Sequence, residues 1–364
     1  MRANMHTKPF DIEVAMKKNQ DLSELEPLEL EKTVVNLGGR PFNARQILKW
    51  IYQQNVTDFT LMTDLPVNLR NTLAHEFTIS TPTTLRPYLS QDGTAKLLLQ
   101  LNDNKQVEAV FIPFTPRMTF CVSTQVGCAM QCDFCLTGQM GLSRNLTAGE
   151  IVGQVRVMAD RFNLTGSSLN VVLMGMGEPL HNYDATIKAI RILNNKNGLA
   201  IPSRRITLST VGLIPEMERL ASESIMPNLA VSLHATTQEL RDRLVPINRK
   251  YSLTDLLSVC RQFPTQRRRR ITFEYVLLAD TNDSMDDVKR LASLLDGMQA
   301  KVNVIPLNES PSIPYRRPSD ERINKFSRAL AQRGITVMVR KSRGRDISAA
   351  CGQLIVEKLP SSAK

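Results

Sequence analysis

The chain has 364 residues, and its 46 Lys and Arg outnumber its 35 Asp and Glu, so the formal net charge is +11. Hydrophobic residues make up 42% and charged residues 22%, which excludes wholesale disorder and allows one large and one smaller domain. The sequence contains no apolar run of about 18 residues, and its first residues form no apolar signal segment, so we expect a cytoplasmic protein without membrane contact. The excess positive charge fits either a solvated basic surface or a polyanionic partner such as nucleic acid.

The first part of the chain, residues 1–83, is predicted to be a small helical accessory domain. A Gly-Gly turn leads into an amphipathic helix that ends near Tyr52. Its polar side carries Arg45 and Lys49, which are weak candidates for contacting a polyanion.

Residues 84–117 are predicted to form a β-linker, because turn residues such as Asp92 and Gly93 separate strand-like segments there. Over 118–345, apolar segments alternate with helical patterns, which indicates βαβ units and a mainly parallel sheet. Six or seven strands are too few for a closed eight-stranded barrel, so we expect an α/β fold with a partial barrel or an open sheet. Residues 346–364 form a C-terminal segment. The expected strands of the sheet are 118–124, 168–175, 204–210, 226–234, 269–278, 301–308 and 335–341, and the helices are 147–162, 182–195, 214–224, 252–263, 284–298 and 319–333.

Four of the six cysteines fall within fifteen residues, and three of these form a Cx3Cx2C motif after the first strand of the alternating region: Cys128, Cys132 and Cys135. Structural zinc requires four ligands, usually as two pairs, and no second pair follows at zinc-finger spacing. Three thiolates on one loop can instead hold three irons of a [4Fe–4S] cluster and leave the fourth iron open. A zinc site and buried thiols without a metal remain the alternatives.

This cysteine motif after the first strand of a βα repeat resembles that of the radical S-adenosylmethionine (SAM) superfamily. The aromatic Phe134 and the Gly-Glu-Pro element around Gly177 and Glu178 fit the same pattern, although such an element alone is often a tight turn. The resemblance implies a partial (βα)6 barrel, one [4Fe–4S] cluster and SAM, with Gly177 and Glu178 at the amino group of SAM.

Polar residues at other strand ends could complete a SAM site. Residues of this kind at a strand end are more often helix caps or turn residues. The superfamily resemblance assigns them to SAM recognition: Ser209, Ser232, Leu233, His234 and Asn308.

Three cysteines lie outside the motif, and lone cysteines are usually small buried side chains. Cys260 has that interpretation, since it lies on the apolar face of a predicted helix. Around the other two, the strings CVSTQVGCAMQCDFC, GLSRNLTAGEI, MGMGEPL, VSLHA and DISAACGQL together resemble the RlmN/Cfr family of RNA methyltransferases.

The family resemblance implies that Cys351 takes a methyl group from one SAM and that a radical made from a second SAM activates this methyl for addition to adenine. Cys121 then attacks Cys351, which releases methylated RNA and leaves a disulfide to be reduced. Glu108 matches the family's proton acceptor, whereas without the resemblance it reads as a charge on the solvent face of a strand.

The same resemblance implies the partners. We expect a monomer that methylates adenine C2 in 23S rRNA near the peptidyl-transferase centre and in tRNA beside the anticodon, with an external electron donor. The C8-methylating branch of the family is the first alternative. A zinc- or cluster-stabilised RNA-binding protein without catalysis is the second.

Two groups of arginines are candidates for phosphate contact, although charge runs are usually solvated faces. One is the run Arg267–Arg270 before the fifth strand. The other leads to Cys351 and consists of Arg316, Arg317, Arg340, Lys341, Arg343 and Arg345.

Overall fold

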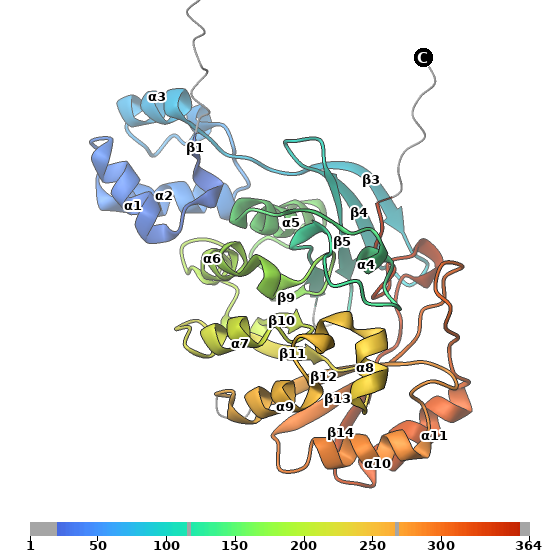
Figure 1. Ribbon diagram of the computed structural model, residues 1–364. Helices are drawn as coiled ribbons and strands as arrows, with labels where there is room; N and C mark the ends of the chain where they lie inside the picture. The colour runs from blue at the N-terminus through green and yellow to red at the C-terminus, as the bar shows by residue number, and fades with distance from the viewer. Residues whose placement is uncertain (1–19, 115–117, 266–268, 357–364) are drawn as a thin grey trace, which may run out of the picture.

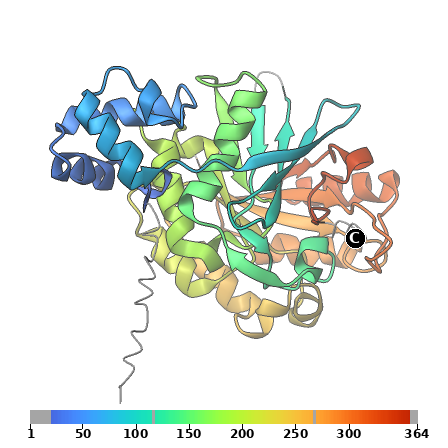
Figure 2. The same cartoon turned by 90° about the horizontal axis from the view of Figure 1, so that it is seen from above.

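The computed structural model describes residues 20–114, 118–265 and 269–356. Within this part of the chain, one ten-stranded sheet carries the fold, with the strand order β14-β13-β12-β11-β10-β9-β6-β5-β4-β3. The connecting helices lie along one face of the curved sheet, and a small helical unit stands at one side of it (Figures 1 and 2). No helix of the described residues is both long and apolar enough to cross a membrane.

The N-terminal unit consists of three helices around an apolar centre, and the predicted amphipathic helix that ends near Tyr52 is the second of them. Proline occupies the first position of α1 and α2, where its fixed φ suits a helix start and its missing N–H costs nothing. The unit lies against the barrel through Gln53, whose side-chain amide donates to the carbonyls of Asn197 and Gly198. The elements are α1 (Pro27–Asn36), α2 (Pro41–Tyr52), α3 (Val67–Glu76) and the short strands β1 (Gln20–Asp21) and β2 (Phe77–Thr78), which pair in parallel.

The region predicted as a β-linker forms an antiparallel meander that continues the main sheet. The turn at Asp92 and Gly93 separates its first two strands, as expected, and its third strand pairs with β6. The segment therefore adds an antiparallel edge to the parallel sheet. Its strands are β3 (Thr83–Leu89), β4 (Ala95–Gln100) and β5 (Gln106–Ile112).

The parallel part of the sheet contains seven strands joined by helical connections, which confirms the predicted α/β partial barrel. All seven residues of β12 are buried, as expected for a strand covered on both faces. The predicted capping box of Thr147 and Glu150 begins α5. The strands are β6 (Met118–Cys121), β9 (Leu169–Leu173), β10 (Ile206–Thr210), β11 (Asn228–Ser232), β12 (Ile271–Leu277), β13 (Ala300–Pro306) and β14 (Thr336–Val339). The predicted helices are α5 (Ala148–Arg161), α6 (Tyr183–Asn194), α7 (Ile214–Ala221), α9 (Leu253–Gln262), α10 (Met285–Leu294) and α11 (Asp320–Ala331).

Four short elements were not predicted. The strands β7 (Gln125–Gly127) and β8 (Leu142–Asn145) pair as an antiparallel ribbon at the base of the cysteine loop, and α4 (Leu136–Gln139) follows its last cysteine. The helix α8 (Gln238–Leu244) precedes α9. These elements add structure around the carboxyl ends of the strands.

Candidate active site

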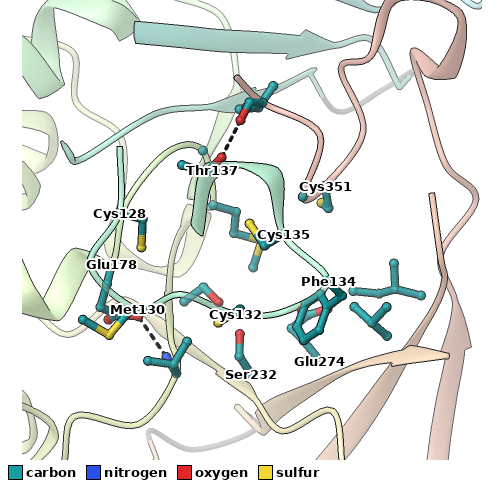
Figure 3. Close-up of a pocket in the computed structure, with 18 of the residues that line it drawn as sticks. Cys128, Met130, Cys132, Phe134, Cys135, Thr137, Glu178, Ser232, Glu274 and Cys351 are labelled. Carbon is teal, nitrogen blue, oxygen red and sulfur yellow. Dashed lines mark hydrogen bonds between the residues drawn. The ribbon is translucent and has the colours of Figure 1, made fainter. Parts of the chain in front are cut away.

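A pocket with an empty volume of about 1020 Å³ lies at the carboxyl ends of the parallel strands, where ligands gather in folds of this kind. Figure 3 shows the motif cysteines around one space, with Cys351 entering from a separate segment of the chain. Among the residues that line the pocket are Cys128, Cys132, Phe134, Cys135, Thr137, Gly177, Glu178, Ser209, Ser232, His234, Glu274, Asn308, Arg340, Cys351 and Leu354.

The loop that carries the motif cysteines is fixed by main-chain hydrogen bonds. The amide of Cys128 donates to Gly141 at 2.9 Å, and that of Cys135 donates to the carbonyl of Cys132 at 3.1 Å. The amide of Asp133 donates to the carbonyl of Leu244 at the end of α8, so this unpredicted helix helps to hold the cysteine loop in place. Burial raises the pKa of Cys128 to about 12 and raises that of Cys132 well above its ordinary value, with neighbouring thiols adding to the shift. A metal bound at this loop would favour the thiolate forms of these cysteines.

The Gly-Glu-Pro element follows β9 and faces this loop. Gly177 has φ +103°, and a Cβ atom there would lie 2.6 Å from the side chain of Gln125, so only glycine fits. The carboxylate of Glu178 accepts from the amides of Leu180 at 3.0 Å and Val211 at 2.9 Å. Burial nevertheless raises the pKa of Glu178 to about 7. The element thus presents a buried, precisely held carboxyl group to the pocket.

The predicted polar residues at strand ends reach the same pocket with one exception. His234, with φ +59°, accepts a hydrogen bond from the amide of Val276 at Nδ1, so its Nε2 carries the proton. Burial and the charge of Arg241 lower the pKa of His234 to about 3, which keeps the ring neutral. Leu233 is fully buried, and its main chain bonds to Glu274 and Arg241, so its side chain is a core residue rather than part of the pocket wall.

Cys351 belongs to a segment, Gly344–Val356, that crosses the mouth of the barrel. Its carbonyl accepts from the Asn308 side chain at 3.3 Å, and the carbonyl of Gly352 accepts from the amide of Leu136 at 2.9 Å. Within the described residues, the segment has no regular element longer than the three-residue 3-10 helix Arg345–Ile347. It is therefore held by contacts to the barrel rather than by its own structure.

A second pocket, with an empty volume of about 1200 Å³, lies on the other side of Cys351. Cys121 lines this second pocket, and both cysteines are free thiols. Burial raises the pKa of Cys121 to about 12, the neighbouring Cys351 adds to this, and Arg340 opposes it. Six residues line both pockets and form their shared wall: Met174, Ile305, Asn308, Arg340, Cys351 and Leu354.

Glu108, predicted as a proton acceptor, is buried in β5 rather than on the solvent face of a strand. Its Oε1 forms an ion pair with Lys96 at 2.8 Å, and its Oε2 accepts from the amide of Ile355 at 3.0 Å. The second contact ties Glu108 directly to the segment that carries Cys351.

Glu274 and Lys96 were missed as residues of the site, whereas Arg340, predicted as a phosphate contact, lines both pockets. Glu274 lines the first pocket, is 4% exposed, and leaves its Oε2 without a hydrogen-bond partner among the described residues. The charges of Cys351, Glu274 and Cys121 raise the pKa of Arg340. A signal existed for Glu274 and Lys96, since each interrupts an apolar strand sequence with a charge.

The basic residues divide into two ends of the sheet. Arg269 and Arg270 precede β12, at the end opposite the pockets, while Arg267 and Arg268 lie outside the described residues. Lys341 and Arg343 line the second pocket. Of the remaining candidates, Arg316 and Arg317 pair with Asp280 and Asp320, and Arg45 and Lys49 are exposed on α2.

Comparisons with known proteins agree with this geometry. Residues 20–79 match the ribosomal RNA large subunit methyltransferase N-terminal domain, and residues 122–293 match the radical SAM superfamily. A crystal structure of a radical SAM methyltransferase from Sphaerobacter thermophilus is 48% identical, with a TM-score of 0.87, covering 92% of this chain and 99% of that one. The fold and the site therefore define a radical SAM methyltransferase.

Curated relatives define the family more narrowly. The dual-specificity RNA methyltransferase RlmN of Geobacter sulfurreducens is 51% identical over 334 residues, covering 92% of this chain and 91% of the relative. The protein of the same description from Syntrophotalea carbinolica is 47% identical over 347 residues, covering 95% of this chain and 92% of the relative. The chain belongs to the RlmN family, which confirms the predicted family.

The site fits the cofactors that radical SAM membership implies. Three thiols line one pocket, which is the donor set of a [4Fe–4S] cluster with an open iron. Asn308 Oδ1 and Glu274 Oε2 are buried there without a hydrogen-bond partner among the described residues, and a polar ligand such as SAM supplies donors for them. No group of His, Cys, Asp and Glu in the described part of the chain is arranged for a single metal ion.

Proposed function

We propose that this protein methylates C2 of adenosine in 23S rRNA, in the peptidyl-transferase region, and in tRNA beside the anticodon. The observation that supports this most directly is the position of Cys351 in a wall between two pockets. The motif cysteines line one pocket and Cys121 lines the other. A cysteine that must first receive a methyl group and then deliver it to RNA needs access to two ligands.

In this proposal the first pocket holds the cofactors. Cys128, Cys132 and Cys135 would hold three irons of a [4Fe–4S] cluster, which would supply the electron for cleaving SAM to a 5′-deoxyadenosyl radical. Glu178 accepts hydrogen bonds from the amino group of SAM, and Asn308 offers its free Oδ1. The other residues assigned to SAM are Gly177, Ser209, Ser232 and His234, with Leu233 contributing its main chain only.

Cys351 carries the methyl group. Its deprotonated sulfur attacks the methyl carbon of one SAM, the bond between that carbon and the SAM sulfur breaks, and S-adenosylhomocysteine leaves. The methylated Cys351 then loses one hydrogen atom to the adenosyl radical, and its methylene carbon adds to adenine C2. This route suits an electron-poor carbon that cannot attack SAM as a nucleophile.

Glu108 and Cys121 complete the reaction. Glu108 accepts the C2 proton, and one electron leaves the adduct for an acceptor, which the oxidised cluster held by the motif cysteines would provide. Cys121 sulfur bonds to Cys351 sulfur as the carbon–sulfur bond breaks, and the released carbon takes up a proton to become the methyl group. The resulting disulfide must be reduced by an external thiol before the next cycle.

The second pocket is assigned to the adenine in this proposal. It combines apolar walls with Lys341 and Arg343, which suits a flipped base attached to a phosphate backbone. The external electron donor and the monomeric state remain predictions.

The variant Cys121→Ala, expressed in cells, tests the assignment. We expect RNA joined covalently to Cys351, identified by mass spectrometry of the nuclease-treated protein. Cys260→Ala is the matched control, because Cys260 is a buried thiol in α9, and it should yield no adduct. Free, fully active Cys121→Ala protein would overturn the proposal, and a methyl group at adenine C8 instead of C2 would replace the reaction with that of the alternative branch.

A further inference from the structure

Lys96 is a buried lysine whose ammonium group contacts a carboxylate, a carbonyl and an aromatic ring. It lies in β4, its side chain is 8% exposed, and its ammonium group is 2.8 Å from Glu108 Oε1. The same ammonium donates to the carbonyl of Ser348 at 3.3 Å and lies 5.0 Å from the centre of the Tyr88 ring. Burying an ammonium group is unfavourable unless the group is paired, so this arrangement needs a reason beyond the packing of a sheet.

The ion pair connects two points of the segment that carries Cys351. Lys96 holds Ser348, three residues before Cys351, and Glu108 holds the amide of Ile355, four residues after it. In the antiparallel register Lys96 lies opposite Val110, so the two charged groups meet diagonally across the strands. One lysine–glutamate pair therefore fixes both sides of the cysteine.

We propose that Lys96 is a positioning residue that keeps Glu108 ionised and in register with Cys351 by binding the carboxylate and the Ser348 carbonyl at the same time. The inference rests on the proposed function, because Glu108 acts as a proton acceptor only if an RNA adduct forms on Cys351. It adds a residue to the proton-transfer step.

The chemistry of that step requires an ionised carboxylate. The adduct gives up its C2 proton, the carbon–hydrogen electron pair stays on the adduct, and Glu108 becomes a carboxylic acid. Glu108 Oε1 stays paired with Lys96, so Oε2 is the oxygen that takes the proton when Ile355 releases it. Without the ammonium group, a buried carboxylate is uncompensated and favours its protonated form, which accepts no proton.

The test compares Lys96→Met with Lys96→Arg, and uses Lys105→Met as the matched control. Lys105 is an exposed lysine in the turn between β4 and β5. Each protein is isolated from cells, and mass spectrometry measures two quantities: the fraction of Cys351 that carries a methyl group and the fraction of target adenosines that are methylated. The first methyl transfer does not use Glu108, so it reports whether the site is folded and loaded.

We expect Lys96→Met to retain methyl-Cys351 while its RNA methylation falls by about 100-fold, the lower range for losing a general base. Lys96→Arg, which keeps the positive charge, should restore RNA methylation to within about tenfold of the wild type, and Lys105→Met should match the wild type.

Three results would overturn the role of Lys96. The first is unchanged RNA methylation in Lys96→Met. The second is a Lys96→Met protein that loses methyl-Cys351 and methylated RNA to the same extent. The third is a Lys96→Arg variant that is as inactive as Lys96→Met. A wild-type protein that carries no methyl-Cys351 and yields no methylated RNA would instead overturn the proposed function itself, so the two failures are distinguishable.

Discussion

The two walls of the site are built in different ways. The motif loop, Cys128–Cys135, takes its shape mainly from neighbours in the chain, through bonds within the loop and to the ribbon of β7 and β8, with one main-chain bond to the distant Leu244. The Cys351 segment, Gly344–Val356, takes its shape from residues far away in the sequence. Asp346, for example, accepts from the Ser90 hydroxyl at 2.6 Å and from the Gln91 amide at 3.2 Å.

This difference suits the two tasks assigned to the walls. Ligands of a metal cluster must keep fixed positions, and a short loop bonded to itself provides them. A cysteine that serves two pockets must shift its side chain between ligands, and a segment without a helix or strand of useful length, anchored at several points, leaves that freedom. Changes to one wall should therefore leave the other intact.

The largest effect is expected from Cys132→Ala in the motif loop. Two cysteines cannot hold the cluster, so the protein should lose its iron and show no methylated RNA and no methyl-Cys351. Iron analysis after anaerobic purification and mass spectrometry measure both. Amide hydrogen exchange over 344–356 should stay as in the wild type, and a Cys132→Ala protein with about four irons per chain would contradict the assignment.

Gly344→Ala acts on the other wall. Gly344 has φ +60°, and an added Cβ atom would lie 2.8 Å from Ala349 and 2.9 Å from Thr94, so the segment should detach at a cost of about 1–2 kcal/mol. RNA methylation should fall about tenfold, with faster hydrogen exchange over 344–356 and an unchanged iron content.

The matched control is Gly334→Ala. Gly334 has φ +80° and nothing within 4 Å of the added atom, so it carries the backbone strain without the clash. If both variants lose RNA methylation equally, the anchoring of the segment is not what matters.

The same difference explains what could be predicted from the sequence. The motif cysteines were found because spacing within a few residues, together with the order of strands, fixes where they lie, and Glu178 was assigned through the superfamily resemblance that these cysteines carry. Cys351 was assigned only through a family resemblance, since its anchors come from β4, β5 and the loop after β13, and one sequence does not show such long-range contacts.

Two kinds of feature could not be predicted: charged residues inside apolar strands, and one short polar helix. Lys96 and Glu274 were not singled out, because burial of a charge depends on partners that are distant in the sequence. The helix α8 was missed because its pattern is mostly polar, yet Arg241 is buried in it and donates to the carbonyls of Leu233 and Val211.

Glu178 should make SAM binding at the motif wall depend on pH. Burial raises its pKa to about 7, so it takes up a proton as the pH falls through 7 and loses the charge that attracts the SAM amino group. Anaerobic calorimetry should show SAM binding weakening about tenfold between pH 8 and pH 6. In Glu178→Gln the affinity should be weak at both pH values and independent of pH.

The free energy of unfolding should depend on pH in the opposite direction to SAM binding, which provides a check on the raised pKa of Glu178. Between its ordinary pKa of 4.5 and its raised value of about 7, Glu178 binds more protons in the folded than in the unfolded chain. The free energy of unfolding of the wild type, measured relative to Glu178→Gln, should therefore fall as the pH rises through this range. A difference that rises with pH would contradict the assigned shift.

The smallest effect is expected where the two walls touch. The hydroxyl of Thr137, in α4 just after the motif, donates to the carbonyl of Leu354 in the Cys351 segment. Thr137→Val removes this donor and leaves a buried carbonyl unpaired, which costs about 1 kcal/mol. Thr186→Val removes a similar buried bond, to Pro179 at 3.0 Å, away from the segment. Both variants should lose about the same stability, but only Thr137→Val should speed hydrogen exchange at 351–356 and lower RNA methylation about fivefold, because only that bond couples the two walls.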